Sequence, residues 1–147
     1  MAIANYSTTV AVHRSVNEIQ TLLAANGAVS VMTDYRDGAP ANISFVMLIA
    51  NQPVSFRLTA NEAGVLRAMQ ADPKVPKSYR TEVQALKVAW RILRDWVRAQ
   101  LAIIEAGIVT LPQVMLPYAV TGTGQTVFER LEEAGPALLQ LESGGTP

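Results

Sequence analysis

Basic residues with helical spacing are the strongest chemical signal in this sequence of 147 residues. Between residues 74 and 104, seven cations stand against two acids, which gives a local net charge of +5. These cations are Lys74, Lys77, Arg80, Lys87, Arg91, Arg94 and Arg98. Because spaced guanidinium groups suit bidentate contact with phosphates, the pattern predicts a surface that could follow a nucleic-acid backbone.

Five of the cations share one strip of a long helix that we predict from Thr81 to Ala106. With Lys87 set to zero and a turn of 100° per residue, Arg80, Arg91, Arg94 and Arg98 all fall within about 40° of it. Two interpretations stay open. The strip binds phosphates, or it is a solvated helix face whose charge is neutralised by nearby acids.

Two aromatic residues accompany this basic segment and are candidates for stacking on bases. Trp90 borders the strip and Tyr79 precedes the helix. Stacking of this kind requires that the rings be exposed.

Two apolar faces flank the strip on the same helix. One contains Leu86, Trp90, Leu93, Val97 and Ile104, and the other contains Ala85, Val88, Ile92, Trp96, Ala99 and Ile103. A surface helix ordinarily has one apolar stripe, so this helix needs two partners. The sheet can cover one face, and the C-terminal helices or a second subunit must cover the other. We therefore expect a homo-oligomer with Ile92, Trp96 and Ile103 in its interface.

The acidic C-terminal segment suggests an alternative function. Residues 105–147 hold five acids and one cation, a net charge of −4, although the whole chain is neutral. The strip of one molecule could dock this segment of a neighbour. The chain would then be a protein-interaction or assembly module without nucleic-acid binding.

Catalytic, metal and cofactor chemistry find little support. The chain has no Cys and a single His, His13, too few for a catalytic triad or a zinc site. Asp34 and Asp37 could hold magnesium, but Asp in a turn mainly accepts backbone hydrogen bonds. The glycine-containing loop at residues 122–126 lacks the lysine that a nucleotide-binding loop carries. We expect a non-enzymatic protein without cofactor or metal.

The N-terminal half reads as a strand, a helix and a three-strand meander. The alternation in residues 6–13 predicts a strand. Ser15 with Glu18 predicts a capping box for a helix that ends at Gly27. Strands follow over residues 29–35, 42–50 and 54–58, with a turn at 36–40. Because residues 42–50 are apolar on both faces, we expect this strand to be central and covered on both sides.

The C-terminal half reads as helical. Thr59 with Glu62 predicts a helix through Gln70, and Thr81 with Gln84 starts the long helix. Residues 110–113 open a short helix that is broken at Pro117. A helix capped by Thr126 with Glu129 follows and reaches Ala134. We expect one α+β domain over residues 1–142 and a flexible tail at 143–147. With no signal peptide or apolar span visible, we expect a soluble cytoplasmic protein without membrane contact.

Two motifs resemble a known family. They are Ala89-Trp90-Arg91-Ile92-Leu93, continuing to Leu101 through Ile108, and Leu116-Pro117-Tyr118 followed by Gly124-Gln125-Thr126-Val127. Over roughly residues 90–131 the chain is similar to small uncharacterised proteins of tailed bacteriophages and prophages. The resemblance implies no activity and no catalytic residues. It implies a host bacterium's cytoplasm and a partner that is DNA, RNA, or a phage or host protein.

Overall fold

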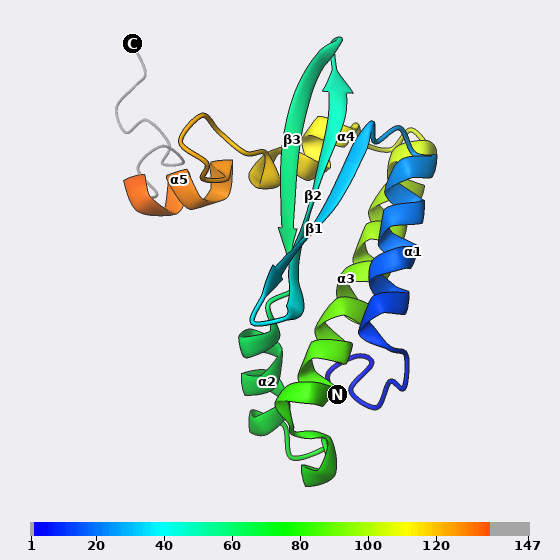
Figure 1. Cartoon of the computed structure of the whole chain (residues 1–147), viewed down its shortest axis with the longest axis vertical. Helices are drawn as coiled ribbons and strands as arrows, with labels where there is room; N and C mark the ends of the chain where they lie inside the picture. Colours follow the sequence, from blue (N-terminus) through cyan, green and yellow to red (C-terminus); the bar gives the residue numbers. More distant parts are fainter. Residues whose placement is uncertain (1, 136–147) are drawn as a thin grey trace, which may run out of the picture.

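The computed structural model describes residues 2–135 of the chain, which form an α+β fold around a long helix (Figure 1). A first helix precedes a three-strand antiparallel sheet, and the remaining elements are helical. The flexible tail expected at residues 143–147 lies outside the described residues.

The sheet is a simple meander. Strands β1 (Ser30–Arg36), β2 (Ala39–Ile49) and β3 (Gln52–Thr59) pair in the order β1-β2-β3. Two-residue turns at residues 37–38 and 50–51 join them, and all four turn residues have positive φ, as tight hairpins require. The three predicted strands and the central place of the middle one are therefore confirmed.

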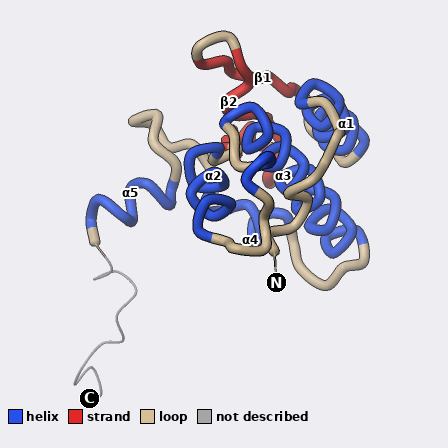
Figure 2. Tube along the Cα trace, turned by 90° about the horizontal axis from the view of Figure 1, so that it is seen from below, coloured by secondary structure: helices blue, strands red, loops and turns tan. Residues whose placement is uncertain are grey.

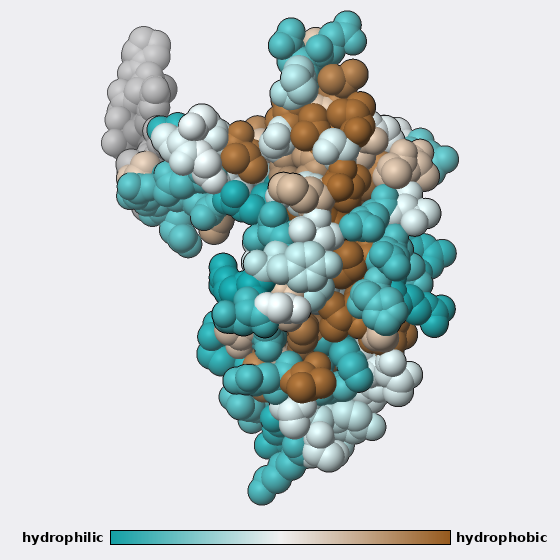
Figure 3. Space-filling view, viewed as in Figure 1, coloured by the Kyte–Doolittle hydropathy of each residue, from teal (hydrophilic) through white to brown (hydrophobic). Residues whose placement is uncertain are grey.

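Only one face of the sheet is fully covered. Ile43, Phe45 and Met47 of β2 are buried on the face toward the helices, where Phe45 stacks on Phe56 at 5.2 Å between ring centroids. On the other face Leu48 is 54% exposed, and apolar atoms show over the upper part of the sheet (Figure 3). The prediction that β2 is covered on both sides is thus wrong for the described chain, because no layer formed by residues 2–135 packs on its outer face there.

The first segment is not a strand. Residues 4–7 form a turn, residues 8–11 are irregular, and helix α1 (Val12–Ala25) begins before the end of the predicted strand. Asn5 has a φ of 62°, which interrupts an extended run. Gln84 Nε2 donates to the carbonyl oxygens of both Tyr6 and Thr8 at 2.9 Å. One side-chain amide therefore binds carbonyl groups that a neighbouring strand would otherwise bind.

The predicted capping box of α1 is also wrong. The helix starts at Val12 after Ala11, which makes no side-chain cap. Ser15 is fully buried inside the helix, and Glu18 extends toward α3. The spacing of Ser15 and Glu18 serves packing between helices, as described below.

Helix α2 (Glu62–Ala71) is capped by Asn61 rather than by Thr59, which belongs to β3. After the short turn η1 (Lys77–Tyr79), helix α3 (Glu82–Glu105) runs the length of the molecule. Thr81 caps it by accepting a hydrogen bond from Gln84 N, as predicted.

Three short elements complete the described chain. Helix α4 (Leu111–Met115) and helix α5 (Val127–Ala134) each begin with a capping box, of which the one at Thr126 was predicted, and η2 (Leu116–Tyr118) lies between them. Seen from below, α5 stands away from the body, whereas α1 and α3 lie together (Figure 2). No helix within residues 2–135 is long and apolar enough to cross a membrane.

The second apolar face of α3 is covered largely within the chain. Its Ala85 and Val88 are fully buried in a cluster with Met69 of α2 and Val75. Ile3 and Tyr6 of the N-terminal segment pack against the same cluster. This face does need a partner other than the sheet, as predicted. Much of its cover comes from α2 and from the first residues of the chain.

Candidate interaction groove

The centre of the basic strip is occupied by an ion-pair cluster. Glu18 of α1 accepts hydrogen bonds from Arg91 Nη1 at 2.7 Å and Arg94 Nε at 2.9 Å. The side chains of Arg91 and Arg94 are only 14% and 19% exposed. Arg91 also donates to Ser15 Oγ, and Arg94 to Asp95. Two of the guanidinium groups predicted to contact phosphates thus bind carboxylates of the same chain.

The protonation of Glu18 reflects this cluster. Partial burial acts to raise its pKa, but the hydrogen bond from Arg91 and the charges of Arg91 and Arg94 outweigh it. The pKa of Glu18 therefore lies below its ordinary value. Glu18 stays ionised at neutral pH and holds α1 against α3.

The other predicted cations do not form a continuous strip. Arg80 donates to the backbone carbonyls of Val75 and Asp72 at 2.9 and 3.0 Å, so it serves local structure. Lys87 is half-buried. Lys74 and Lys77 are exposed at the far end of α2, whereas Arg98 is exposed beside α1.

Neither predicted aromatic residue is free for stacking on a base. Trp90 is 0% exposed, and its Nε1 donates to the carbonyl oxygen of Pro40. The expectation that Trp90 stacks on a base is wrong, because the ring belongs to the core between α3 and the sheet. Tyr79 is half-buried and packs edge-on against Tyr6.

The predicted oligomer interface is largely occupied by the chain itself. Ile92 packs against the cluster under α2, and Trp96 makes an edge-to-face contact with Tyr118 at 5.5 Å between ring centroids. Ile103 is half-buried. Self-association through these residues stays a prediction, but the uncovered face on which it depended is partly filled.

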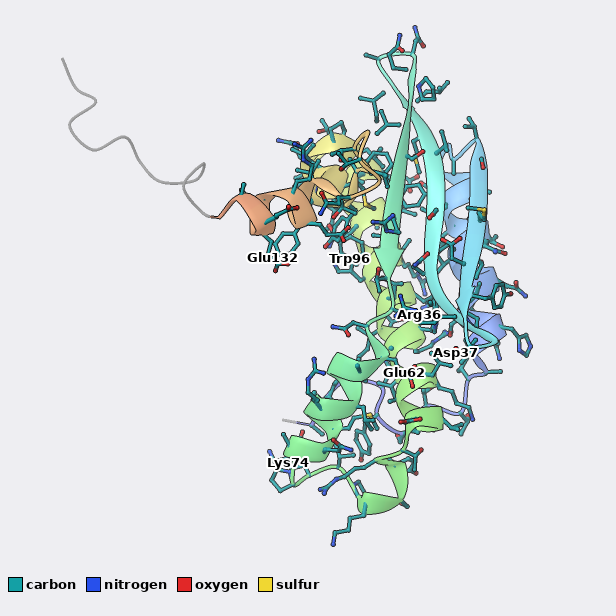
Figure 4. All side chains as sticks on the ribbon, turned by 60° about the vertical axis from the view of Figure 1, so that its left-hand side comes forward. Arg36, Asp37, Glu62, Lys74, Trp96 and Glu132 are labelled. Atoms are coloured by element: carbon teal, nitrogen blue, oxygen red, sulfur yellow. The ribbon has the colours of Figure 1, made fainter. Side chains whose placement is uncertain are left out.

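A large concave surface lies elsewhere, between the sheet and the ends of three helices. This groove has a volume of about 1130 Å³. Its walls are the β1–β2 turn, the starts of α2 and α3, and the segment from η2 to α5. Figure 4 shows Arg36 and Asp37 of the turn close to Glu62 at the start of α2, with α5 above them. Figure 3 shows the hollow at the same height, between α5 and α2.

Large apolar side chains line opposite walls of this groove without being buried. Val83 of α3 is 71% exposed and Phe128 of α5 is 52% exposed. Leu86 and Tyr118 line the groove beside them and are half-buried. Exposed apolar residues gathered in a concavity are typical of binding surfaces.

The groove is acidic. Its charged residues are Asp34, Asp37, Glu62, Glu82 and Glu129 against Arg36 and Arg57, which gives a net charge of −3. We call it the acidic groove. It contains the first-turn acids of both α2 and α3, so one carboxylate stands at each helix start.

One ion pair joins α5 to the sheet. Arg57 Nη2 donates to Glu129 Oε1 at 2.8 Å, and both Nη atoms of Arg57 donate to the carbonyl oxygen of Gly124. Hydrogen bonds from the backbone and side chain of Thr126 lower the pKa of Glu129, and Arg57 lowers it further. These contacts position the α5 wall of the groove.

The candidate metal and catalytic residues do not assemble into a centre. Asp34 and Asp37 both line the acidic groove, and Asp34 accepts a hydrogen bond from Ser44. Within residues 2–135, no three carboxylates or histidines lie close enough to hold a metal ion. His13 is exposed at the start of α1, away from these acids.

Sequence reasoning missed the acidic groove because its residues come from distant parts of the chain. One signal was present: on the angular scale above, Val83 falls at about −40°, an apolar residue on the cationic side of the helix. An apolar side chain on the charged face of a helix indicates that this face contacts another part of the protein or a partner.

Comparison with known proteins adds no assignment. No protein-family model matches the chain, and the comparisons with curated proteins and with solved structures find no match.

Proposed function

We propose that the chain is a non-enzymatic protein-interaction module, and that the acidic groove receives a segment of another protein molecule. The observation that carries the proposal is the pair of exposed apolar side chains, Val83 and Phe128, on opposite walls of one concavity. An occupant that contacts both would bury the apolar surface of these two side chains without a change of fold.

The groove suits recognition better than the basic strip does. Its walls are fixed by capped helices and by the Arg57–Glu129 pair, so little ordering is needed on binding. The strip, in contrast, has Arg91 and Arg94 already paired with Glu18. Nucleic-acid binding therefore becomes the second candidate, supported by the exposed Lys74, Lys77 and Arg98 alone.

The phage or prophage origin, and with it the cytoplasm of an infected or lysogenic bacterium, belongs to the same proposal. It is supported by the sequence motifs between residues 90 and 131. A partner encoded by the phage or by its host would fit a small module of this kind.

Site-specific photocrosslinking tests the proposal. A benzophenone amino acid replaces Val83 in the full chain, which is expressed in bacteria, irradiated and purified. Ile108 is the matched control position, since it is an apolar residue that is 73% exposed but lies outside the groove. We expect a discrete protein adduct from position 83 and none from position 108. Equal labelling from both positions, or no adduct from position 83, would reject the proposal.

A further inference from the structure

A second surface of the chain is opposite in charge to the acidic groove. The connection between α2 and η1, residues 73–77, protrudes at the lower end of the molecule (Figure 1). We call it the basic tip. Its Pro73, Lys74, Pro76 and Lys77 are exposed, whereas Val75 is fully buried beneath them. In Figure 4, Lys74 lies at the end of α2 opposite to Glu62.

The basic tip is held in one conformation by the chain itself. Asp72 accepts a hydrogen bond from Lys74 N through its side chain and one from Val75 N through its carbonyl oxygen. Arg80 binds the carbonyl oxygens of Asp72 and Val75 at the same time. An arginine that could be exposed is thus used to brace a loop. A braced loop loses little conformational entropy when it binds.

The chemistry of the tip matches that of the groove. Pro76 has φ −59° and ψ 146°, the polyproline II conformation, which docks well on aromatic surfaces. Tyr118 and Phe128 supply such surfaces in the groove. The two ammonium groups of the tip are opposite in charge to the groove, whose net charge is −3.

The groove also contains a polar atom that an ammonium group could satisfy. Asn42 lines the groove, and its Oδ1 is buried without a hydrogen-bond partner. A lysine ammonium group is a donor of the kind that this oxygen lacks.

We infer that the occupant of the acidic groove is the basic tip of a second copy of this chain. The inference rests on the proposed function, since it names the partner for the same groove. Tip and groove are different surfaces, so the contact is head-to-tail, and such contacts close into rings or continue as filaments. The neutral net charge of the chain, with its opposite charges separated, favours this association.

Charge reversal on each surface tests the inference. One variant, reversed at the tip, carries Lys74→Glu and Lys77→Glu. Another, reversed at the groove, carries Glu62→Lys and Glu82→Lys. Each is studied as the full chain by sedimentation velocity over a range of concentrations, with circular dichroism to confirm folding. We expect concentration-dependent association of the wild type and a dissociation constant raised more than about tenfold in each variant.

Mixing the two variants gives the decisive measurement. A reversed tip carries acids and a reversed groove carries cations, so the two variants should associate with each other although neither associates alone. The control variant Glu105→Lys changes an exposed acid of α3 outside the groove and should associate like the wild type.

Failure of this inference is distinguishable from failure of the proposed function. A monomeric wild type, or association that neither reversal weakens, overturns the head-to-tail contact. So does a mixture of the reversed variants that stays monomeric. If position 83 nevertheless crosslinks to a different protein, the groove still binds a partner and only its identity changes. If position 83 crosslinks to nothing, both ideas are rejected.

Discussion

Replacing Glu18 with glutamine removes the charge that joins α1 to α3 while keeping the size of the side chain. Arg91 and Arg94 then lie together with no carboxylate of α1 between them. The amide oxygen of glutamine can still accept hydrogen bonds from both guanidinium groups, but it does not neutralise their charges. We expect the folded state to lose stability without a change of fold.

The expected loss follows from the exposure of the cluster. A hydrogen bond to a charged group contributes about 1.5–3 kcal/mol when buried, and an exposed ion pair less than about 1 kcal/mol. The side chains of Glu18, Arg91 and Arg94 are 27%, 14% and 19% exposed, which places their two contacts between these limits. Arg14 Nε lies 3.4 Å from Glu18 Oε1, and the Arg14 side chain is 68% exposed, so this third ion pair adds little to the stability. We therefore expect the free energy of unfolding to fall by about 2 kcal/mol.

Urea unfolding followed by tryptophan fluorescence measures this change. At an m-value of about 2 kcal/mol per molar, the midpoint should fall by about 1 M while m stays constant. Glu105→Gln is the matched control, because Glu105 is exposed at the end of α3 and makes no ion pair within residues 2–135. It should leave the midpoint nearly unchanged.

A loss below about 0.5 kcal/mol for Glu18→Gln would show that the cluster behaves as an exposed ion pair. Glu18 would then not fix α1 on α3, and Arg91 and Arg94 would be available to bind nucleic acid.

Three further predictions follow from the same contacts. Folding lowers the pKa of Glu18, so the stability that its carboxylate contributes is complete above about pH 4.5 and is lost as the pH falls through the folded pKa. The acid unfolding curves of the wild type and of Glu18→Gln should therefore converge at low pH. Trp90→Phe leaves a backbone carbonyl of β2 without its donor and opens space in the core, so it should cost about 1–3 kcal/mol in urea unfolding. Labelled single- and double-stranded DNA should bind weakly at low salt, and Arg98→Glu, which leaves the Glu18 cluster intact, should change the binding little. Tight binding that Arg98→Glu strongly weakens would restore the nucleic-acid hypothesis.

The sequence predicted the elements whose signals are local. The three strands, the long helix and the capping box at Thr126 each depend on neighbours a few residues apart, and all are present. The failures share a different cause. The alternation in residues 6–13 and the Ser15–Glu18 pair were interpreted locally, but Gln84 and Arg91, more than 70 residues away, determine what these segments do.

The candidate site was harder to predict for the same reason. Angular spacing placed Arg91 and Arg94 on one strip correctly, but spacing on one helix cannot show that Glu18 of another helix faces them. The acidic groove is assembled from the hairpin, the starts of α2 and α3, and α5. Only the fold brings those four segments together.

The bond between Gln84 and Tyr6 spans 78 positions of the chain, and the bond between Glu18 and Arg91 spans 73. On a ribosome that adds about 5–20 residues per second, α1 therefore waits roughly 4–15 s for the helix that covers it. During that interval the meander emerges with Ile43, Phe45 and Met47 uncovered. The first sixty residues are thus not an independent folding unit. A chaperone would bind these strands, or early aggregation would begin from them, during the interval before α3 emerges.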